Sequence, residues 1–336
     1  MSDQDERVAE FLRAQAEVTS PAYAALPSTA EFASGKHRHL YKGEEPTDWI
    51  EFSTVPADAK ERKHWFAEGS MGHPAKANIE MMRSIWRHVG TTFGHDAGKG
   101  TYEGQVLMDF FGGTGTSMMA TLEGYKVILC ELEPTYINLI KESMKKISSL
   151  AGWDISANVL LLEGDNRITI PTARREAFLK WGRPDIHHIM GSPPYAAVLS
   201  VSKPKAESTK HLAGSYSESI QVYSDHARSI GKLSKFQYNH EMTKVYKACH
   251  DALVPGGTMT TIMKDFMRQG ERQYLSKWFE KVCTEDAIGW KDGTPHFMSL
   301  QWHKRHSPGT GYLKLHESRG NEVVLDEDIV IFGKAY

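Results

Sequence analysis

One stretch decides the fold of this 336-residue chain: Leu107-Met108-Asp109-Phe110-Phe111-Gly112-Gly113-Thr114-Gly115-Thr116. It predicts a buried strand at 105–109 that ends in an acid and continues through a glycine-rich turn into a helix at 116–123. Glycine lets the backbone pass close to a ligand, and a helix start offers unpaired N–H groups. The glycine spacing matches neither the Walker loop nor the dinucleotide motif GxGxxG. A purely structural turn would show the same pattern.

Outward from this turn, strands and helices alternate along the chain. We expect strands at 126–131, 158–163, 186–191, 258–263, 298–302 and 328–332, and helices at 76–89, 134–150 and 240–253. This alternation predicts an α/β, Rossmann-like fold with a mostly parallel seven-stranded sheet and helices on both faces. Ligands of such sheets bind beyond the carboxyl ends of the strands.

Composition excludes several classes of protein. Hydrophobic residues make up 40% of the chain and charged residues 24%, which suits a large core and argues against a disordered chain. The formal charge of −2 excludes nucleic-acid binding by bulk positive charge, but not a local basic groove. No apolar run has the length of a membrane span, and the chain starts with no signal-peptide pattern. The three cysteines show no CxxC spacing, so we expect no metal site and a cytoplasmic protein.

Three further motifs follow expected strands. Glu131 lies about 20 residues after Asp109, where an acid can accept hydrogen bonds from ribose hydroxyls. Asp165 could accept a hydrogen bond from an adenine amine, although Gly-Asp is also a common turn pair. The motif 192–195 reads Ser-Pro-Pro-Tyr, a rigid turn whose hydroxyl, carbonyls and aromatic ring could hold a planar base that bears an amine. The ordinary alternatives are a solvent-facing glutamate and a proline loop.

Together these motifs resemble those of S-adenosylmethionine-dependent DNA amino-methyltransferases, over residues 72–334. The family has Asp-x-Phe-x-Gly-x-Gly-Thr, usually with proline after the Asp, where this chain has Phe110. The segment 72–76 resembles the family's lead into the cofactor-binding helix. The cofactor-binding residues that the resemblance implies are Asp109, Phe111, Gly113, Gly115, Thr116, Glu131, Asp165, His73 and Lys76. The catalytic residues that it implies are Ser192, Pro193, Pro194 and Tyr195.

The resemblance implies a class I methyltransferase fold at 71–336, after an N-terminal arm or helical extension at 1–70. It implies methyl transfer from S-adenosylmethionine to a base that is flipped out of double-stranded DNA, with S-adenosylhomocysteine as the second product. It also implies a protein of the cytoplasm of a prokaryotic or phage-infected cell. The Ser form of the motif is most typical of cytosine-N4 enzymes. A restriction endonuclease is a possible partner that the resemblance leaves open. Adenine-N6 methylation, an RNA amino-methyltransferase and a non-catalytic DNA-binding protein remain alternatives. The absence of Pro-Cys disfavours methylation at cytosine C5.

Since no large recognition domain follows the last strand, we expect the contact with nucleic acid to come from residues 1–70 or from an insert at about 196–240. The lysines and aromatic residues of the insert could follow a phosphate backbone and stack on bases. The candidate nucleic-acid-binding residues are Lys203, Lys205, Lys210, Arg228, Lys232 and Lys235. A solvated insertion with ordinary lysines is the alternative.

Overall fold

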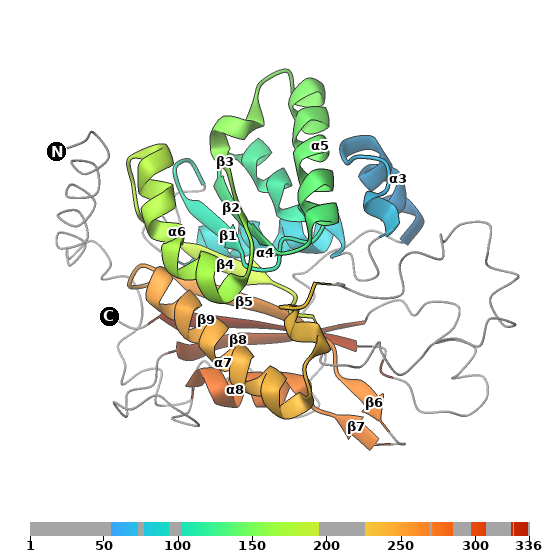
Figure 1. Ribbon diagram of the computed structural model, residues 1–336, viewed down its shortest axis with the longest axis vertical. Coiled ribbons are helices and arrows are strands. Elements are labelled where there is room, and N and C mark those ends of the chain that lie inside the picture. Colours follow the sequence, from blue (N-terminus) through green and yellow to red (C-terminus); the bar gives the residue numbers. More distant parts are fainter. Residues whose placement is uncertain are drawn as a thin grey trace, which may run out of the picture.

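The computed structural model centres on a seven-stranded sheet in the order β3-β2-β1-β4-β5-β9-β8 (Figure 1). The described residues are 55–72, 77–93, 102–194, 226–268, 271–284, 297–306, 324 and 326–334. The strands of this sheet are β1 (Val106–Asp109), β2 (Lys126–Glu131), β3 (Val159–Glu163), β4 (His188–Gly191), β5 (Thr258–Met263), β8 (Phe297–His306) and β9 (Asp326–Lys334). The prediction of seven strands is confirmed.

The strand order places a crevice in the middle of the sheet. Neighbouring strands from β3 to β5 pair in parallel, whereas β9 is antiparallel to both β5 and β8. The chain starts centrally with β1, builds outward to β3, and then returns to add β4 on the other side of β1. Ligands of α/β sheets bind at such a reversal, beyond the carboxyl ends of the strands. This order and pairing confirm the predicted Rossmann-like α/β fold with a mostly parallel sheet.

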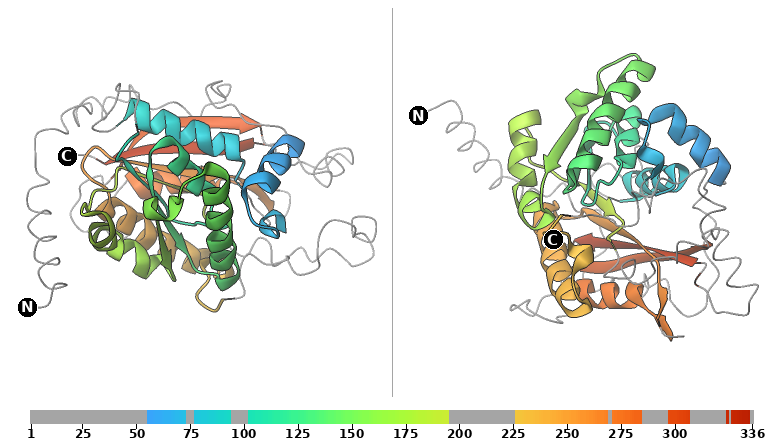
Figure 2. Two further views of the ribbon diagram at one scale, coloured as in Figure 1. Left: turned by 90° about the horizontal axis from the view of Figure 1, so that it is seen from above. Right: turned by 45° about the vertical axis from the view of Figure 1, so that its right-hand side comes forward.

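Helices cover both faces of the sheet (Figure 2). α4 (Ile79–Thr92), the three-ten helix η3 (Thr116–Glu123) and α5 (Pro134–Ala151) share one buried apolar cluster with the strands. α6 (Asn166–Trp181), α7 (Lys235–Ala252) and α8 (Leu275–Thr284) share the cluster on the other face. The sheet is therefore buried on both sides, which explains the nearly continuous apolar sequence of its central strands.

Three helices differ from their predicted form or extent. α4 covers Ile79–Thr92 rather than 76–89. α7 begins at Lys235 rather than 240, because Ser234 and Gln237 form a capping box ahead of the apolar positions. The helix at 116–123 is a three-ten helix, bounded on both sides by glycines in the left-handed region, Gly115 and Gly124.

Three helices and one hairpin were not predicted from the sequence. α6 has weak apolar periodicity and carries Pro171 inside the helix, so its pattern resembled a loop. α8 and the short hairpin of β6 (Phe266–Arg268) and β7 (Glu271–Gln273) follow β5. The fourth is α3 (Val55–Trp65), which lies in the segment assigned to an N-terminal arm.

α3 packs against the rest of the fold near its carboxyl end, where Arg62 and the following Phe66 are buried. The division into 1–70 and 71–336 stays a prediction. Short three-ten turns are η2 (Ser70–Gly72), η4 (Ile155–Asn158) and η5 (Ile230–Lys232). No helix in the described part of the chain is long and apolar enough to cross a membrane.

Candidate active site

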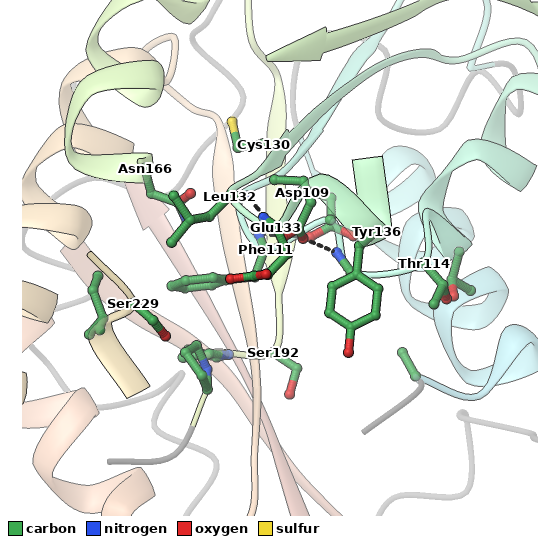
Figure 3. Close-up of a pocket in the computed structure, with 18 of the residues that line it drawn as sticks. Asp109, Phe111, Thr114, Cys130, Leu132, Glu133, Tyr136, Asn166, Ser192 and Ser229 are labelled. Atoms are coloured by element: carbon green, nitrogen blue, oxygen red, sulfur yellow. Dashed lines mark hydrogen bonds between the residues drawn. The ribbon is translucent and has the colours of Figure 1, made fainter. Parts of the chain in front are cut away.

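A cavity opens where β1, β2 and β4 end, at the crevice in the sheet (Figure 3). The space between its walls is about 980 Å³, the solvent at its mouth included. The wall includes nine of the predicted cofactor-binding and catalytic residues, namely Asp109, Phe111, Gly113, Thr116, Glu131, Asp165, Ser192, Pro193 and Pro194. The structure thus brings the motifs after four strands to one place.

The glycine turn is fixed against the end of β2. The N–H of Gly112 donates to the carbonyl of Cys130 at 2.8 Å, and the N–H of Gly115 donates back to Gly112 at 2.7 Å. Gly113 and Gly115 have φ of 53° and 80°, the left-handed region that favours glycine. A Cβ on Gly115 would also lie 2.8 Å from Cε of Met118. Gly115 is not on the cavity wall, so it shapes the turn that other residues present to the ligand.

Glu131 ends β2 with a buried carboxylate on the cavity wall. Its Oε1 accepts from the backbone N–H groups of Leu132 at 2.8 Å and Glu133 at 2.9 Å, and its Oε2 accepts from Gly113 at 2.6 Å. An ionised carboxylate has about four acceptor positions, so one on Oε2 is left for a ligand hydroxyl. Burial raises the pKa of Glu131 to about 7, although the three backbone bonds act to lower it.

Asp109 ends β1 and is engaged with the turn itself. Its Oδ1 accepts from the N–H of Phe111 at 3.1 Å, and its Oδ2 accepts from the hydroxyl of Ser117 at 2.5 Å. Burial raises the pKa of Asp109 to about 7 against the effect of these two bonds. Asp109 therefore links the first turn of η3 to the end of β1 and holds the glycine turn in place through these two bonds.

Asp165 caps α6 and has a cation as its main partner. Its carboxylate accepts from the N–H and from the guanidinium of Arg167, which also pairs with Glu241 of α7 at 2.5 Å. Burial raises the pKa of Asp165, but the bonds from Arg167 outweigh this effect and hold the pKa below its usual value. The predicted contact with an adenine amine stays a prediction.

The turn at 192–194 forms another part of the wall, and Figure 3 shows Ser192 at the same cavity as the rings of Phe111 and Tyr136. The residue before this turn is Gly191, at the end of β4. A Cβ there would lie 2.8 Å from the ring of Phe110. The phenylalanine that replaces the family's proline therefore requires glycine at 191.

Arg62 of α3 is a site residue that the sequence analysis missed. It is fully buried and donates to the hydroxyls of Thr116 at 3.0 Å and Thr114 at 3.4 Å, and to the carbonyl of Ala77 at 2.6 Å. Both threonine oxygens accept from Arg62, so their own hydrogens can point into the cavity toward an anion. Burial lowers the pKa of Arg62, while Asp58 at 3.7 Å opposes this effect. No sequence signal marks it, because it lies in a charged segment that is typical of a solvated helix.

Several apolar and aromatic wall residues were missed as well. Leu132 and Tyr136 follow Glu131, the acid predicted to bind ribose, and Ile230 lines the cavity from η5. The backbone N–H of His226, within the predicted insert, donates to the carboxylate of Glu133 at 3.1 Å and so fixes this part of the chain beside the cavity. Leu132 and Tyr136 could have been suspected from their position directly after Glu131 at a strand end.

The other predicted residues divide into two groups. His73, Lys76, Tyr195, Lys203, Lys205 and Lys210 lie outside the described residues, and their roles stay predictions. Arg228, predicted to contact nucleic acid, is on the cavity wall. Lys232 and Lys235 are exposed and are not part of that wall.

The wall offers three features that S-adenosylmethionine requires. Glu131 has an acceptor position for a ribose hydroxyl, and Leu132 and Ile230 offer apolar surface to a purine ring. The hydroxyls of Thr114 and Thr116, backed by a buried guanidinium, suit the carboxylate at the amino-acid end of the molecule. The residues present therefore fit this cofactor. Among the described residues no group of three or more His, Cys, Asp or Glu could hold a metal ion.

Comparisons with known proteins agree on the fold alone. No family model and no curated protein matches the chain. Among solved structures it is similar to TrmN from Thermus thermophilus, with 11% identity over 79% of this chain and a TM-score of 0.42. The match spans about half of TrmN, 51% of its length.

Two further solved structures resemble the chain at a similar level. For a SAM-dependent methyltransferase from Agrobacterium tumefaciens the identity is 13%, over 78% of this chain and 63% of that one, with a TM-score of 0.42. For precorrin-6y C5,15-methyltransferase from Geobacter metallireducens the identity is 12%. The match covers 83% of this chain and 95% of that one, with a TM-score of 0.38. Likeness at this level carries no argument about substrate, so the argument for function rests on the cavity.

Proposed function

We propose that the chain is an S-adenosylmethionine-dependent methyltransferase that modifies an exocyclic amine of a DNA base, preferably N4 of cytosine. One observation carries the proposal: the Ser-Pro-Pro turn after β4 lines the same cavity as Glu131 and the glycine turn. A cofactor held by Glu131 would thus share its cavity with groups that can hold an amine. The geometry supports shared use of this cavity, and the DNA substrate rests on the resemblance of the motif at 192–195.

S-adenosylmethionine would supply a methyl group on a positively charged sulfur. The exocyclic amine is a poor nucleophile, because its lone pair is delocalised into the base. The hydroxyl of Ser192 and the carbonyl of Pro193 would accept the two amine hydrogens and favour a pyramidal nitrogen whose lone pair faces the methyl group. Transfer would form an N–C bond and break the S–C bond of S-adenosylmethionine, and one amine proton would be released to water. Orientation supplies most of the acceleration.

The target base must leave the duplex to reach this cavity, as in other enzymes that act on a base. The neutral hydroxyl of Ser192 suits the amine of cytosine, as the family resemblance implies for the Ser form of the motif. Adenine N6 would use the same acceptors, so the product must be identified by experiment.

The test uses purified protein with methyl-labelled S-adenosylmethionine and, separately, duplex DNA and RNA. We expect label in DNA, and we expect Ser192→Ala to lower turnover far more than cofactor affinity, because its bond to the amine strengthens in the transition state. Ser149→Ala, on the exposed side of α5, is the matched control and should behave as wild type. Cofactor binding by wild type without transfer to any nucleic acid would contradict the proposal and favour a non-catalytic binding protein.

A further inference from the structure

Two aromatic side chains are exposed beside the candidate active site, on elements that adjoin each other. Phe236 in the first turn of α7 is 84% exposed, and Tyr274 directly after β7 is 48% exposed. The two elements are linked, because Nζ of Lys235 donates to Oε1 of Gln273 at 3.3 Å. Figure 1 shows the β6–β7 hairpin projecting from the fold near this end of α7. Exposed aromatic residues on two linked elements mark a surface for a ligand better than a single exposed ring does.

Basic residues lie near both rings, in two short segments that are bounded by acids at Asp225, Glu241, Glu271 and Glu280. Residues 226–240 contain an arginine and two lysines without any Asp or Glu, and residues 272–279 contain an arginine and a lysine, again without an acid. Nζ of Lys277 lies 4.5 Å from the ring centroid of Tyr274, and the guanidinium of Arg272 lies 5.6 Å from it. Arg272 also pairs with Asp265 at 3.0 Å. The surface thus combines ring faces with a local excess of positive charge in a chain of net charge −2.

The surface is continuous along the chain with the cavity. Residues 228–230 line the cavity, and α7 begins only five residues later at Lys235. The capping box of Ser234 and Gln237 fixes the first turn of α7, so Phe236 is presented on a rigid element. The capped first turn of α7 therefore begins close along the chain to the cavity wall.

From this arrangement we propose that the surface of Phe236, Tyr274, Lys235 and Lys277 binds an unpaired segment of DNA. The two rings stack on bases, and the two lysines contact phosphates. Aromatic platforms with flanking cations are how proteins hold single strands without reading their sequence. An apolar protein partner fits less well, because charged side chains flank each ring. The inference rests on the proposed function for its choice of DNA and adds the place where the strand beside the flipped base is held.

The test measures fluorescence anisotropy of a labelled oligo(dT) with the full chain. We expect Phe236→Ala and Tyr274→Ala each to weaken binding about fivefold to 150-fold, the range for loss of one stacked base. Lys235→Ala should reduce the slope of log affinity against log salt by about 0.7, the value for one phosphate of a single strand. Matched controls are Trp153→Ala, a tryptophan that is 40% exposed after α5, and Lys145→Ala; both should bind as wild type.

Each outcome bears on the inference. Unchanged oligo(dT) affinity in folded Phe236→Ala and Tyr274→Ala would overturn it, and so would equal losses in the Trp153→Ala control. Tighter binding of oligo(U) with the same dependence on the rings would overturn the choice of DNA. If wild type binds no S-adenosylmethionine but the two ring variants still bind oligo(dT) more weakly than wild type does, the surface is upheld and the proposed function is refuted. This outcome distinguishes failure of the proposed function from failure of the inference.

Discussion

Glu131→Gln is the most informative change in the cofactor half of the cavity. The glutamine carbonyl can still accept from Leu132 and Glu133, but its NH₂ group would then face the N–H of Gly113, which the carboxylate accepts at 2.6 Å. The variant therefore loses the bond to Gly113 and the acceptor position on Oε2 that we assign to the ribose. The fold keeps two of its three bonds, whereas alanine would remove all of them.

The magnitude follows from the charge of the acceptor. A hydrogen bond to an ionised group contributes about 1.5–3 kcal/mol, and about 1.4 kcal/mol is a tenfold change in affinity. The loss of one ribose bond should thus weaken binding of S-adenosylhomocysteine about tenfold to 150-fold. The lost bond to Gly113 should lower the free energy of unfolding by a similar amount.

Isothermal titration calorimetry with S-adenosylhomocysteine measures the affinity, and urea unfolding measures the stability. Glu163→Gln is the matched control, because Glu163 ends the neighbouring strand in register with Glu131 but is half exposed and pairs with Lys141. It should bind as wild type. Wild-type affinity in folded Glu131→Gln would refute the ribose assignment.

The affinity should also depend on pH, since the ribose hydroxyl donates to the ionised form of Glu131. With a pKa of about 7, the carboxyl becomes protonated below neutrality. Affinity for adenosine, which has no group titrating near neutral pH, should then fall by up to about tenfold per pH unit below about pH 7. Glu131→Gln should remove this dependence, and a slope that survives in that variant would contradict the assignment.

Three further changes test the turn and its support. Arg62→Leu leaves the carbonyl of Ala77 without its donor and should lower the free energy of unfolding by about 1–3 kcal/mol, whereas the exposed Arg87→Met should cost at most about 1 kcal/mol in urea unfolding. Gly115→Ala should cost more than Gly152→Ala, because both have positive φ but only Gly115 has neighbours that its Cβ would strike; thermal unfolding compares them. The raised pKa of Asp109 means that the native state binds more protons than the unfolded chain between about pH 4 and 7, so stability should fall as pH rises through this window; Asp109→Asn should flatten the dependence.

The strand ends could be predicted because buried parallel strands leave a strong sequence signal. Apolar runs that stop at Asp109, Glu131 and Gly191 mark the carboxyl edge of the sheet, and the glycine turn shows where the first helix opens. The motif at 192–194 could be assigned to the same edge, so its meeting with Glu131 was expected from topology alone. This part of the site follows from local sequence plus the strand order.

The contribution of α3 could not be predicted, since it depends on packing between distant segments. Arg62 reaches Thr116 across more than fifty residues of chain, and its neighbours in sequence are charged. α6 was hidden by Pro171 and its weak periodicity, although its cap Asp165 was noticed for another reason. The exposure of Phe236 could not be predicted, because the sequence analysis began this helix at 240, whereas the capping box sets its start at Lys235.

Mass spectrometry of nucleosides from a host that expresses the chain tests the central claim most directly. We predict N4-methylcytosine in its DNA, and none in DNA from a host that expresses folded Ser192→Ala. N6-methyladenine as the sole product would refute the base assignment. Unmodified DNA alongside methylated RNA would contradict the proposed substrate class.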